Sequence, residues 1–154
     1  MTSDSPTHVT VARPAWLAVL ARATLTELEN MHLTVGELPE LQRVRPAEIG
    51  MVMLRGRVGG TGNPFNLGEA SVVRCAVRLG QGPLGVAYAL GRDKRRAELA
   101  ALFDALLQDP QHHDTMQREL IAPLARLQAR ARAQRQHAVA GSKVEFFTFV
   151  RGEA

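Results

Sequence analysis

Apolar residues recur at helical spacing near the start of the chain. Pro14 suits the first turn of a helix, because its fixed backbone angle fits there and its missing N–H is not needed. The apolar stripe that follows is formed by Trp16, Leu17 and Leu20. Thr24 and Glu27 have the spacing of a capping box and predict a second short helix. The inward-facing residues of that helix are expected to be Leu25 and Leu28.

From Gly50 the apolar period changes from helical spacing to two, which is typical of strands. Three alternating runs follow, at residues 50–58, 73–79 and 84–90. In the second run Val73, Cys75, Val77 and Leu79 share one face. The turn Gly80-Gln81-Gly82-Pro83 joins the last two runs. Short turns between strands predict an antiparallel meander. Before the first run, Gly36, Pro39 and Pro46 indicate turns or breaks in regular structure.

The second half of the chain returns to helical spacing. Asp93 is predicted to cap a helix that runs to about Gln108 and stops at Asp109-Pro110. Its apolar stripe is Leu99, Leu102, Phe103 and Leu106. A further helix is predicted from about Asp114 to Gly141, with a bend at Pro123. Its apolar face is Leu120, Leu124, Leu127 and Ala131.

Residues 143–150 are predicted to form a last strand that is apolar on both faces. Such a strand is normally covered on each side, and in a small domain the second cover can be another chain. The expected fold is therefore α+β: a small antiparallel sheet, made of the meander and the C-terminal strand, with N-terminal and C-terminal helices packed on it. One domain over residues 1–154 is expected, with residues 1–12 as a disordered tail.

Composition narrows the class of protein. Of the 154 residues, 45% are hydrophobic and 22% charged, as in ordinary globular domains. The longest apolar run, residues 15–21, falls far short of the roughly 20 residues of a membrane helix. No signal peptide is visible at the N-terminus, so the cytoplasm is the expected compartment. The one cysteine, Cys75, excludes an internal disulfide and a multi-cysteine metal site.

The net charge of +4 is unevenly distributed. Residues 50–91 hold four arginines against one glutamate, and residues 118–135 hold five arginines against one glutamate. The first block contains the candidate anion loop Gly59, Gly60, Thr61 and Gly62, whose backbone N–H groups could face a phosphate. The pattern alone favours an ordinary hairpin loop running to Gly68.

Four arginines of the first block, Arg55, Arg57, Arg74 and Arg78, would share a sheet face if their strands are neighbours. That face would suit a phosphorylated ligand or an acidic partner, and a solvated face is an equal interpretation. Arg92 and Lys94 flank the predicted cap and are further candidates for phosphate binding, although a solvated helix start is the simpler view. The arginine-rich helix could bind nucleic acid, but its lack of interleaved aromatics favours a surface helix.

Catalytic and metal-binding groupings are not apparent. The five histidines are His8, His32, His112, His113 and His137, and none has a second ligand at metal-binding spacing. No Ser–His–Asp, Cys–His or paired-carboxylate arrangement stands out. Cys75 lies on an apolar strand face and is predicted to be a core residue. The residues alone therefore predict a small binding domain without catalytic apparatus.

Several segments together resemble one family. Residues 58–70, VGGTGNPFNLGEA, resemble its GGTG-x-x-F-x-x-G-[DE] signature, and RCAVRL at 74–79 continues it. Similar motifs recur at residues 91–106, at 120–124 (LIAPL) and at 144–152 (VEFFTFVRG). The resemblance covers roughly residues 45–151 and is to the PhnG family, whose members are subunits of the bacterial carbon–phosphorus lyase system for phosphonate degradation. The chain departs from that family at Cys75, where a small residue such as alanine is usual.

The resemblance implies a cytoplasmic complex with the carbon–phosphorus lyase subunits PhnH, PhnI and PhnJ (H, I and J), with PhnL and PhnK (L and K) associated. That complex displaces the adenine of ATP with an alkylphosphonate such as methylphosphonate. In the family, nucleosidase chemistry belongs to PhnI, and radical cleavage with S-adenosylmethionine and an iron–sulfur cluster belongs to PhnJ. No cofactor or metal and no catalytic residue is thus expected on this chain, and neither a membrane nor nucleic acid is expected as a partner. A partner interface is expected at Phe146, Phe147, Phe149 and Arg151. The alternative from another class is a free-standing nucleotide- or nucleic-acid-binding module.

Overall fold

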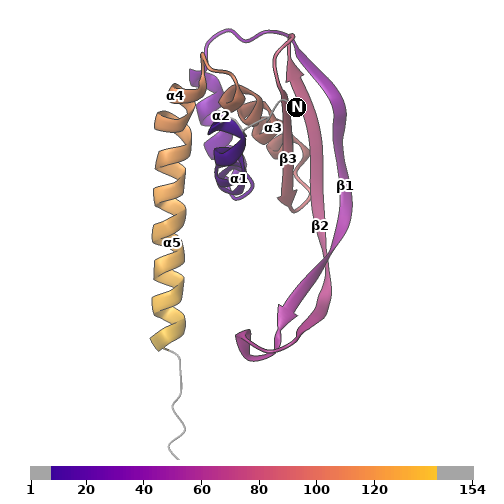
Figure 1. Ribbon diagram of the computed structural model, residues 1–154, viewed down its shortest axis with the longest axis vertical. Helices are drawn as coiled ribbons and strands as arrows, with labels where there is room; N and C mark the ends of the chain where they lie inside the picture. The colour runs from indigo at the N-terminus through magenta and orange to yellow at the C-terminus, as the bar shows by residue number, and fades with distance from the viewer. Residues whose placement is uncertain (1–7, 142–154) are drawn as a thin grey trace, which may run out of the picture.

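A three-stranded antiparallel sheet with helices on one side makes up the fold (Figure 1). The computed structural model describes residues 8–141. The sheet order is β1-β2-β3, as the predicted meander requires. Its strands are β1 (Leu41–Arg57), β2 (Pro64–Leu79) and β3 (Leu84–Leu90). The strand predicted at residues 143–150 lies outside the described residues.

The helices form successive layers on the sheet. The principal ones are α1 (His8–Leu20), α2 (Leu25–Thr34), α3 (Lys94–Gln108) and α5 (Ala122–Gly141). Residues 8–141 also contain three short helical turns: η1 (Val58–Gly60), α4 (His113–Met116) and the π-helical η2 (Gln117–Ile121). Helix α3 lies against all three strands, α1 and α2 pack on α3, and α5 contacts α1. The predicted α+β class, with flanking helices packed on an antiparallel sheet, is confirmed.

Helix α1 begins earlier than expected. It includes residues 8–12 of the predicted tail, and Pro14 lies inside it rather than in its first turn. A proline inside a helix removes one backbone hydrogen bond. Trp16 and Leu20 are both buried in the core, and such packing outweighs local propensity in most protein helices.

The capping box of α2 forms as predicted. The backbone N–H of Glu27 donates to Thr24 Oγ1 at 3.3 Å, and the backbone N–H of Thr24 donates to Glu27 Oε2 at 2.8 Å. Leu28 is fully buried, and Leu25 packs at the margin of the core. The two reciprocal bonds fix the start of α2, which places Leu28 against the rest of the core.

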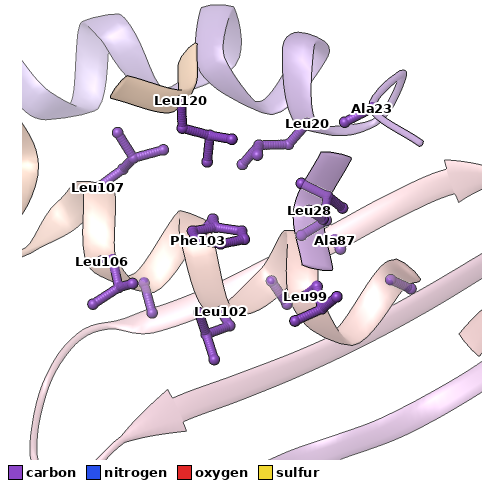
Figure 2. Close-up of a cluster of buried hydrophobic side chains, with 14 of the residues drawn as sticks. Leu20, Ala23, Leu28, Ala87, Leu99, Leu102, Phe103, Leu106, Leu107 and Leu120 are labelled. Atoms are coloured by element: carbon purple, nitrogen blue, oxygen red, sulfur yellow. The ribbon is translucent and has the colours of Figure 1, made fainter. Parts of the chain in front are cut away.

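Helix α3 is the centre of the core. All residues from Leu99 to Leu107 are buried, so the predicted stripe is confirmed but the helix is covered on every side. Figure 2 shows leucines of α3 and Phe103 surrounded by side chains from α1, α2 and η2. On the sheet side, β3 presents only Gly85, Ala87 and Ala89. A Cβ atom on Gly85 would lie 1.9 Å from the carbonyl oxygen of Ala101, so the backbones of β3 and α3 are in direct contact.

Helix α5 leaves the body of the protein. The π turn η2 ends at Ile121, two residues before Pro123, and such a turn is expected where a proline interrupts a helix. Leu120 and Leu124 are buried, but Leu127 is exposed, and residues 129–140 are exposed on every side. The predicted apolar face is therefore wrong beyond Leu124, because α5 continues past the layer that covers it (Figure 1).

Strand β1 is much longer than predicted. It begins at Leu41 instead of Gly50 and continues through Pro46. The ladder to β2 shifts register between Arg43 and Arg45 and again between Arg45 and Glu48, so Pro46 falls in an irregular stretch. β1 is also an edge strand, and edges and bulges are where a sheet tolerates proline.

Candidate functional site

The Gly-rich segment forms the tip of the β1–β2 hairpin. Gly59 and Gly60 have φ angles of 59° and 83°, which side chains rarely adopt. The N–H of Gly62 donates to the carbonyl of Val58 at 2.7 Å, and Arg57 Nη1 donates to the carbonyl of Gly62 at 3.2 Å. These contacts confirm a hairpin turn, but it ends at Asn63, because Pro64 already pairs with Arg57. The expected loop running to Gly68 is thus too long.

The four strand arginines do not form one cluster. β1 and β2 are neighbours, yet Arg55 pairs with Asn66 while Arg74 pairs with Glu48. The two positions are seven residues apart along β1, roughly 23 Å at the usual strand rise. The register also separates them by face: Ile49 pairs with the buried Val73, so alternation places Arg55 and Arg57 on the helix-facing side and Arg74 and Arg78 on the opposite side. The prediction of a shared arginine face is therefore wrong.

Arg74 belongs to a polar row across the sheet. Its Nε donates to Glu48 Oε1 at 2.8 Å, and its partner on β3 is Tyr88. Hydrogen bonds with Tyr88 and Glu48 raise the pKa of the Arg74 guanidinium. Arg74 is accordingly engaged within the sheet, whereas Arg55 and Arg57 stand exposed near the hairpin tip.

The start of α3 holds a second, separate group of cations. Asp93 caps the helix as predicted, with its Oδ1 accepting from the N–H of Arg96 at 2.9 Å. Arg96 donates to the carbonyls of Ala23 and Leu90, so it joins α3 to the neighbouring elements. Arg92 and Lys94 are exposed. Leu90, which precedes this group, pairs with Val72, six residues of β2 or roughly 20 Å from the partner of Arg55.

The most elaborate polar cluster surrounds Asp104, which is fully buried in α3. Arg13 donates to both carboxylate oxygens, with distances of 3.1 and 2.6 Å from Nε and Nη2. Trp16 Nε1 donates to Oδ1 at 2.8 Å, and the backbone N–H of Val86 donates to Oδ2 at 2.9 Å. Gln108 Nε2 adds a longer bond of 3.3 Å. Five donors saturate a carboxylate that offers about four lone-pair positions, so Asp104 joins α1, β3 and α3.

Sequence reasoning missed this cluster. In the sequence, Asp104 stands only as one residue of a family motif, and nothing links it to Arg13 or Trp16. A signal is nevertheless present, because Asp104 is the only charged residue between Leu99 and Leu107 of a predicted core helix. A buried carboxylate requires partners, and Arg13 lies one turn before Trp16 on a helix.

Cys75 is a core residue, as predicted. It is buried on the helix-facing side of β2. Burial, aided by the negative charge of Glu98, raises the pKa of the Cys75 thiol to about 11. The side chain therefore stays a protonated thiol at neutral pH and is a poor nucleophile.

Two histidines, His112 and His113, have structural partners within the protein, whereas Nδ1 of His32 is buried without a hydrogen-bond partner in the described part of the chain. His112 Nδ1 lies 2.7 Å from Asp109 Oδ2, and His113 Nδ1 lies 2.6 Å from the carbonyl of Leu107. His113 also meets the ring of Trp16 edge-on. Across residues 8–141, no three His, Cys, Asp or Glu side chains gather as a metal site would require. In the same range, no helix combines the length and the apolar character needed to cross a bilayer.

The remaining candidates are the C-terminal interface residues and the arginine-rich helix, and the structure describes only the helix. Phe146, Phe147, Phe149 and Arg151 lie outside the described residues. Helix α5 carries exposed arginines at positions 126, 130, 132 and 135 and has no acidic residue. The described residues thus form a small α+β protein with exposed cations at the hairpin tip, at the start of α3 and along α5. Two elements project from its body, α5 and the β1–β2 hairpin.

Comparison with known proteins defines the family. The model of the family "Phosphonate metabolism protein PhnG" matches residues 11–152. A curated relative from Rhizobium meliloti (strain 1021), "Alpha-D-ribose 1-methylphosphonate 5-triphosphate synthase subunit PhnG", is 47% identical over 137 residues. That alignment covers 89% of this chain and 87% of the relative. The chain belongs to the PhnG family, and the resemblance predicted from the sequence is confirmed.

Proposed function

We propose that this chain is a non-catalytic subunit of an α-D-ribose 1-methylphosphonate 5-triphosphate synthase. The observation that carries the proposal is its 47% identity to a named subunit of such a synthase. The complex would transfer the ribose triphosphate moiety of ATP to an alkylphosphonate and release adenine. Its other chains would be PhnH, PhnI and PhnJ, with PhnL and PhnK associated, in the cytoplasm.

The chemistry of the described residues supports an accessory role. Asp104 is saturated by donors, and Cys75 is buried as a protonated thiol. The acid–base and nucleophilic groups of the reaction would therefore lie on other chains, as would any metal or iron–sulfur cofactor. The test is to co-express the chain with the other subunits and separate the mixture by size exclusion. Elution of this chain as a separate monomer would contradict the proposal.

The hairpin tip is the part of the chain best suited to a phosphate. It joins exposed Arg55 and Arg57 to the Gly59–Gly62 turn, and guanidinium groups bind phosphate oxygens in a planar, two-pronged manner. Arg92 and Lys94, which follow the end of β3, would form a separate contact. We expect Arg55→Ala and Arg57→Ala each to raise the KM for ATP by about tenfold, because each removes one charge-assisted hydrogen bond to the phosphate.

Arg45→Ala is the matched control for these variants. Arg45 is an exposed arginine on the same strand, but it is placed at the body of the protein, where it pairs with Glu48 at 3.2 Å. Its removal is expected to leave the kinetics unchanged. Unaltered KM in both tip variants, with an intact complex, would remove the phosphate role and leave the role as a subunit standing.

One observation favours a second candidate function, nucleic-acid binding. Arg132 and Arg135 of α5 line a groove with Arg22, which lies in the turn after α1. A basic helix of this kind would bind phosphates weakly and in a salt-dependent way. A gel shift at low salt with the isolated chain tests it, and the accessory-subunit proposal expects no retardation of DNA or RNA.

A further inference from the structure

The end of the β1–β2 hairpin projects from the body as a two-stranded ribbon, defined as residues 51–57 and 64–71. β3 reaches only as far as Leu90, which pairs with Val72, and the N–H of Gly91 adds one bond to the carbonyl of Ser71. Beyond that point, within residues 8–141, each ribbon strand pairs only with the other. Figure 1 shows the two strands continuing well past β3 and past helices α1 to α3. A two-stranded hairpin alone in water is marginally stable at best.

The ribbon is apolar on both of its faces. Ile49 pairs with the buried Val73, so Met51 and Met53 lie on the helix-facing side by alternation. Val52, Leu54 and, across the strands, Phe65 occupy the opposite side. The exposed fraction is 59% for Met51 and 66% for Leu67, which occupies a bulge in the ladder.

The geometry of the ribbon is reinforced without help from the body. The Phe65 ring lies over Gly56, where a Cβ atom would be only 3.2 Å from Cζ. An aromatic ring over a cross-strand glycine is a known device for holding register. The ribbon therefore presents a defined shape, and contiguous exposed apolar surface of this kind marks an interaction site.

Charge divides the ribbon into a stem and a tip. The only ionised side chains of residues 51–71 are Arg55, Arg57 and Glu69, and both arginines are at the tip. The apolar stem consists of Met51, Val52, Met53 and Leu54. The name of the relative's product contains a triphosphate, the kind of anion that a cationic tip complements.

We propose that the apolar stem of the ribbon inserts into a groove on another polypeptide of the synthase and delivers Arg55 and Arg57 to the triphosphate site held there. This proposal rests on the proposed function and names the contact through which it operates. A two-fold contact between copies of this chain would cover one face and leave the other in water, whereas a groove covers both. The ribbon would then complete a site that neither chain forms alone.

The test separates stem from tip in the co-expressed complex. Met53→Glu and Leu54→Glu, one on each face, are each expected to weaken association with the other subunits by at least about tenfold, because each buries an unpaired charge. Arg55→Ala and Arg57→Ala are expected to leave association intact and to raise the KM for ATP. Leu33→Glu is the matched control, because Leu33 is 84% exposed on α2, away from the ribbon.

Two further measurements, thermal stability and amide hydrogen exchange, test whether the stem is folded in the free chain and covered in the complex. The stem variants are expected to keep the far-ultraviolet circular dichroism and melting temperature of the wild type, because their side chains are exposed in the free chain. Amides of residues 51–57 are expected to exchange fast in the free chain and to be protected in the complex. Wild-type chain that never joins the complex would refute the proposed function itself.

Three results would overturn the inference about the ribbon while the proposed function stands. The first is normal assembly of both stem variants with the other subunits. The second is a dimer of the isolated chain that Met53→Glu dissociates, since a second copy would then cover the stem. The third is ribbon protection in the isolated chain that disappears when residues 142–154 are removed, since that segment would then be the cover.

Discussion

Removal of the Asp104 charge should destabilise the protein more than any exposed substitution. In Asp104→Asn, the amide retains one acceptor oxygen but turns N–H groups toward donors from Arg13, Trp16 and Val86. Breaking a buried ion pair costs about 3–5 kcal/mol, and a buried donor left without an acceptor costs about 1–3 kcal/mol. These contributions overlap, and the Arg13 side chain is 29% exposed, so we expect a loss of about 3 kcal/mol.

The assay is urea unfolding followed by fluorescence of Trp16, the only tryptophan in the chain and a direct partner of Asp104. With an m-value of about 2 kcal/mol/M, the midpoint should fall by roughly 1.5 M. Asp114→Asn, at an exposed position of α4, is the control and should change the free energy of unfolding by less than about 0.5 kcal/mol. A loss below about 1 kcal/mol for Asp104→Asn, at an unchanged m-value, would refute the assigned role.

A double-mutant cycle isolates the ion pair from the other bonds. Arg13→Met alone leaves Asp104 with the donors of Trp16, Val86 and Gln108, so its cost should be smaller than that of Asp104→Asn. In the Asp104→Asn background, the same change should cost less than in the wild type by about 1 kcal/mol or more. Strict additivity would show that Arg13 does not interact with the carboxylate in solution.

Two further predictions concern the packing of the sheet. Gly85→Ala should lower the free energy of unfolding by at least about 3 kcal/mol or abolish soluble expression, because its Cβ would meet the backbone of Ala101. Gly50→Ala is the matched control, because nothing lies within 4 Å of its Cβ. Equal stability of the two variants would contradict the contact between β3 and α3. The pKa of the Cys75 thiol is higher in the folded protein, about 11, than in the unfolded chain, about 9. The buried thiol therefore contributes its full share to the free energy of unfolding below about pH 9, and that share is lost as the pH rises toward about 11. The decrease should be roughly 2–3 kcal/mol larger in wild type than in Cys75→Ala, as measured by urea unfolding across that range, and parallel pH profiles would argue against a buried thiol.

Local signals in the sequence predicted the elements well. The capping box of Thr24 and Glu27, the cap at Asp93 and the face of Val73, Cys75 and Val77 are all confirmed. Each depends on neighbours a few residues away, and that information is present in the sequence itself. The predicted elements are wrong where the decisive contact is distant, as with Pro14 inside α1 and Pro46 inside β1.

The candidate site was less predictable than the fold. Alternation placed Arg55 and Arg74 on possible sheet faces, but only the register of the hairpin shows that they are far apart. Register depends on pairing along the whole ladder, which the sequence of either strand alone does not specify. The Asp104 cluster joins residues separated by up to 91 positions, so no local pattern could reveal it.

The bond between Arg13 and Asp104 also bears on how the chain is made. β3 and α3 are adjacent in sequence and can pack as soon as both have left the ribosome, whereas α1 emerges first and has its buried partner 91 residues later. At about 5–20 residues per second, α1 waits roughly 5–18 seconds for Asp104 to be synthesised. During that interval Trp16 and Leu20, which end in the core, have no α3 to cover them. Helix α1 is therefore among the last elements to be fixed, and the nascent chain is exposed to misassembly at this helix until α3 has been made.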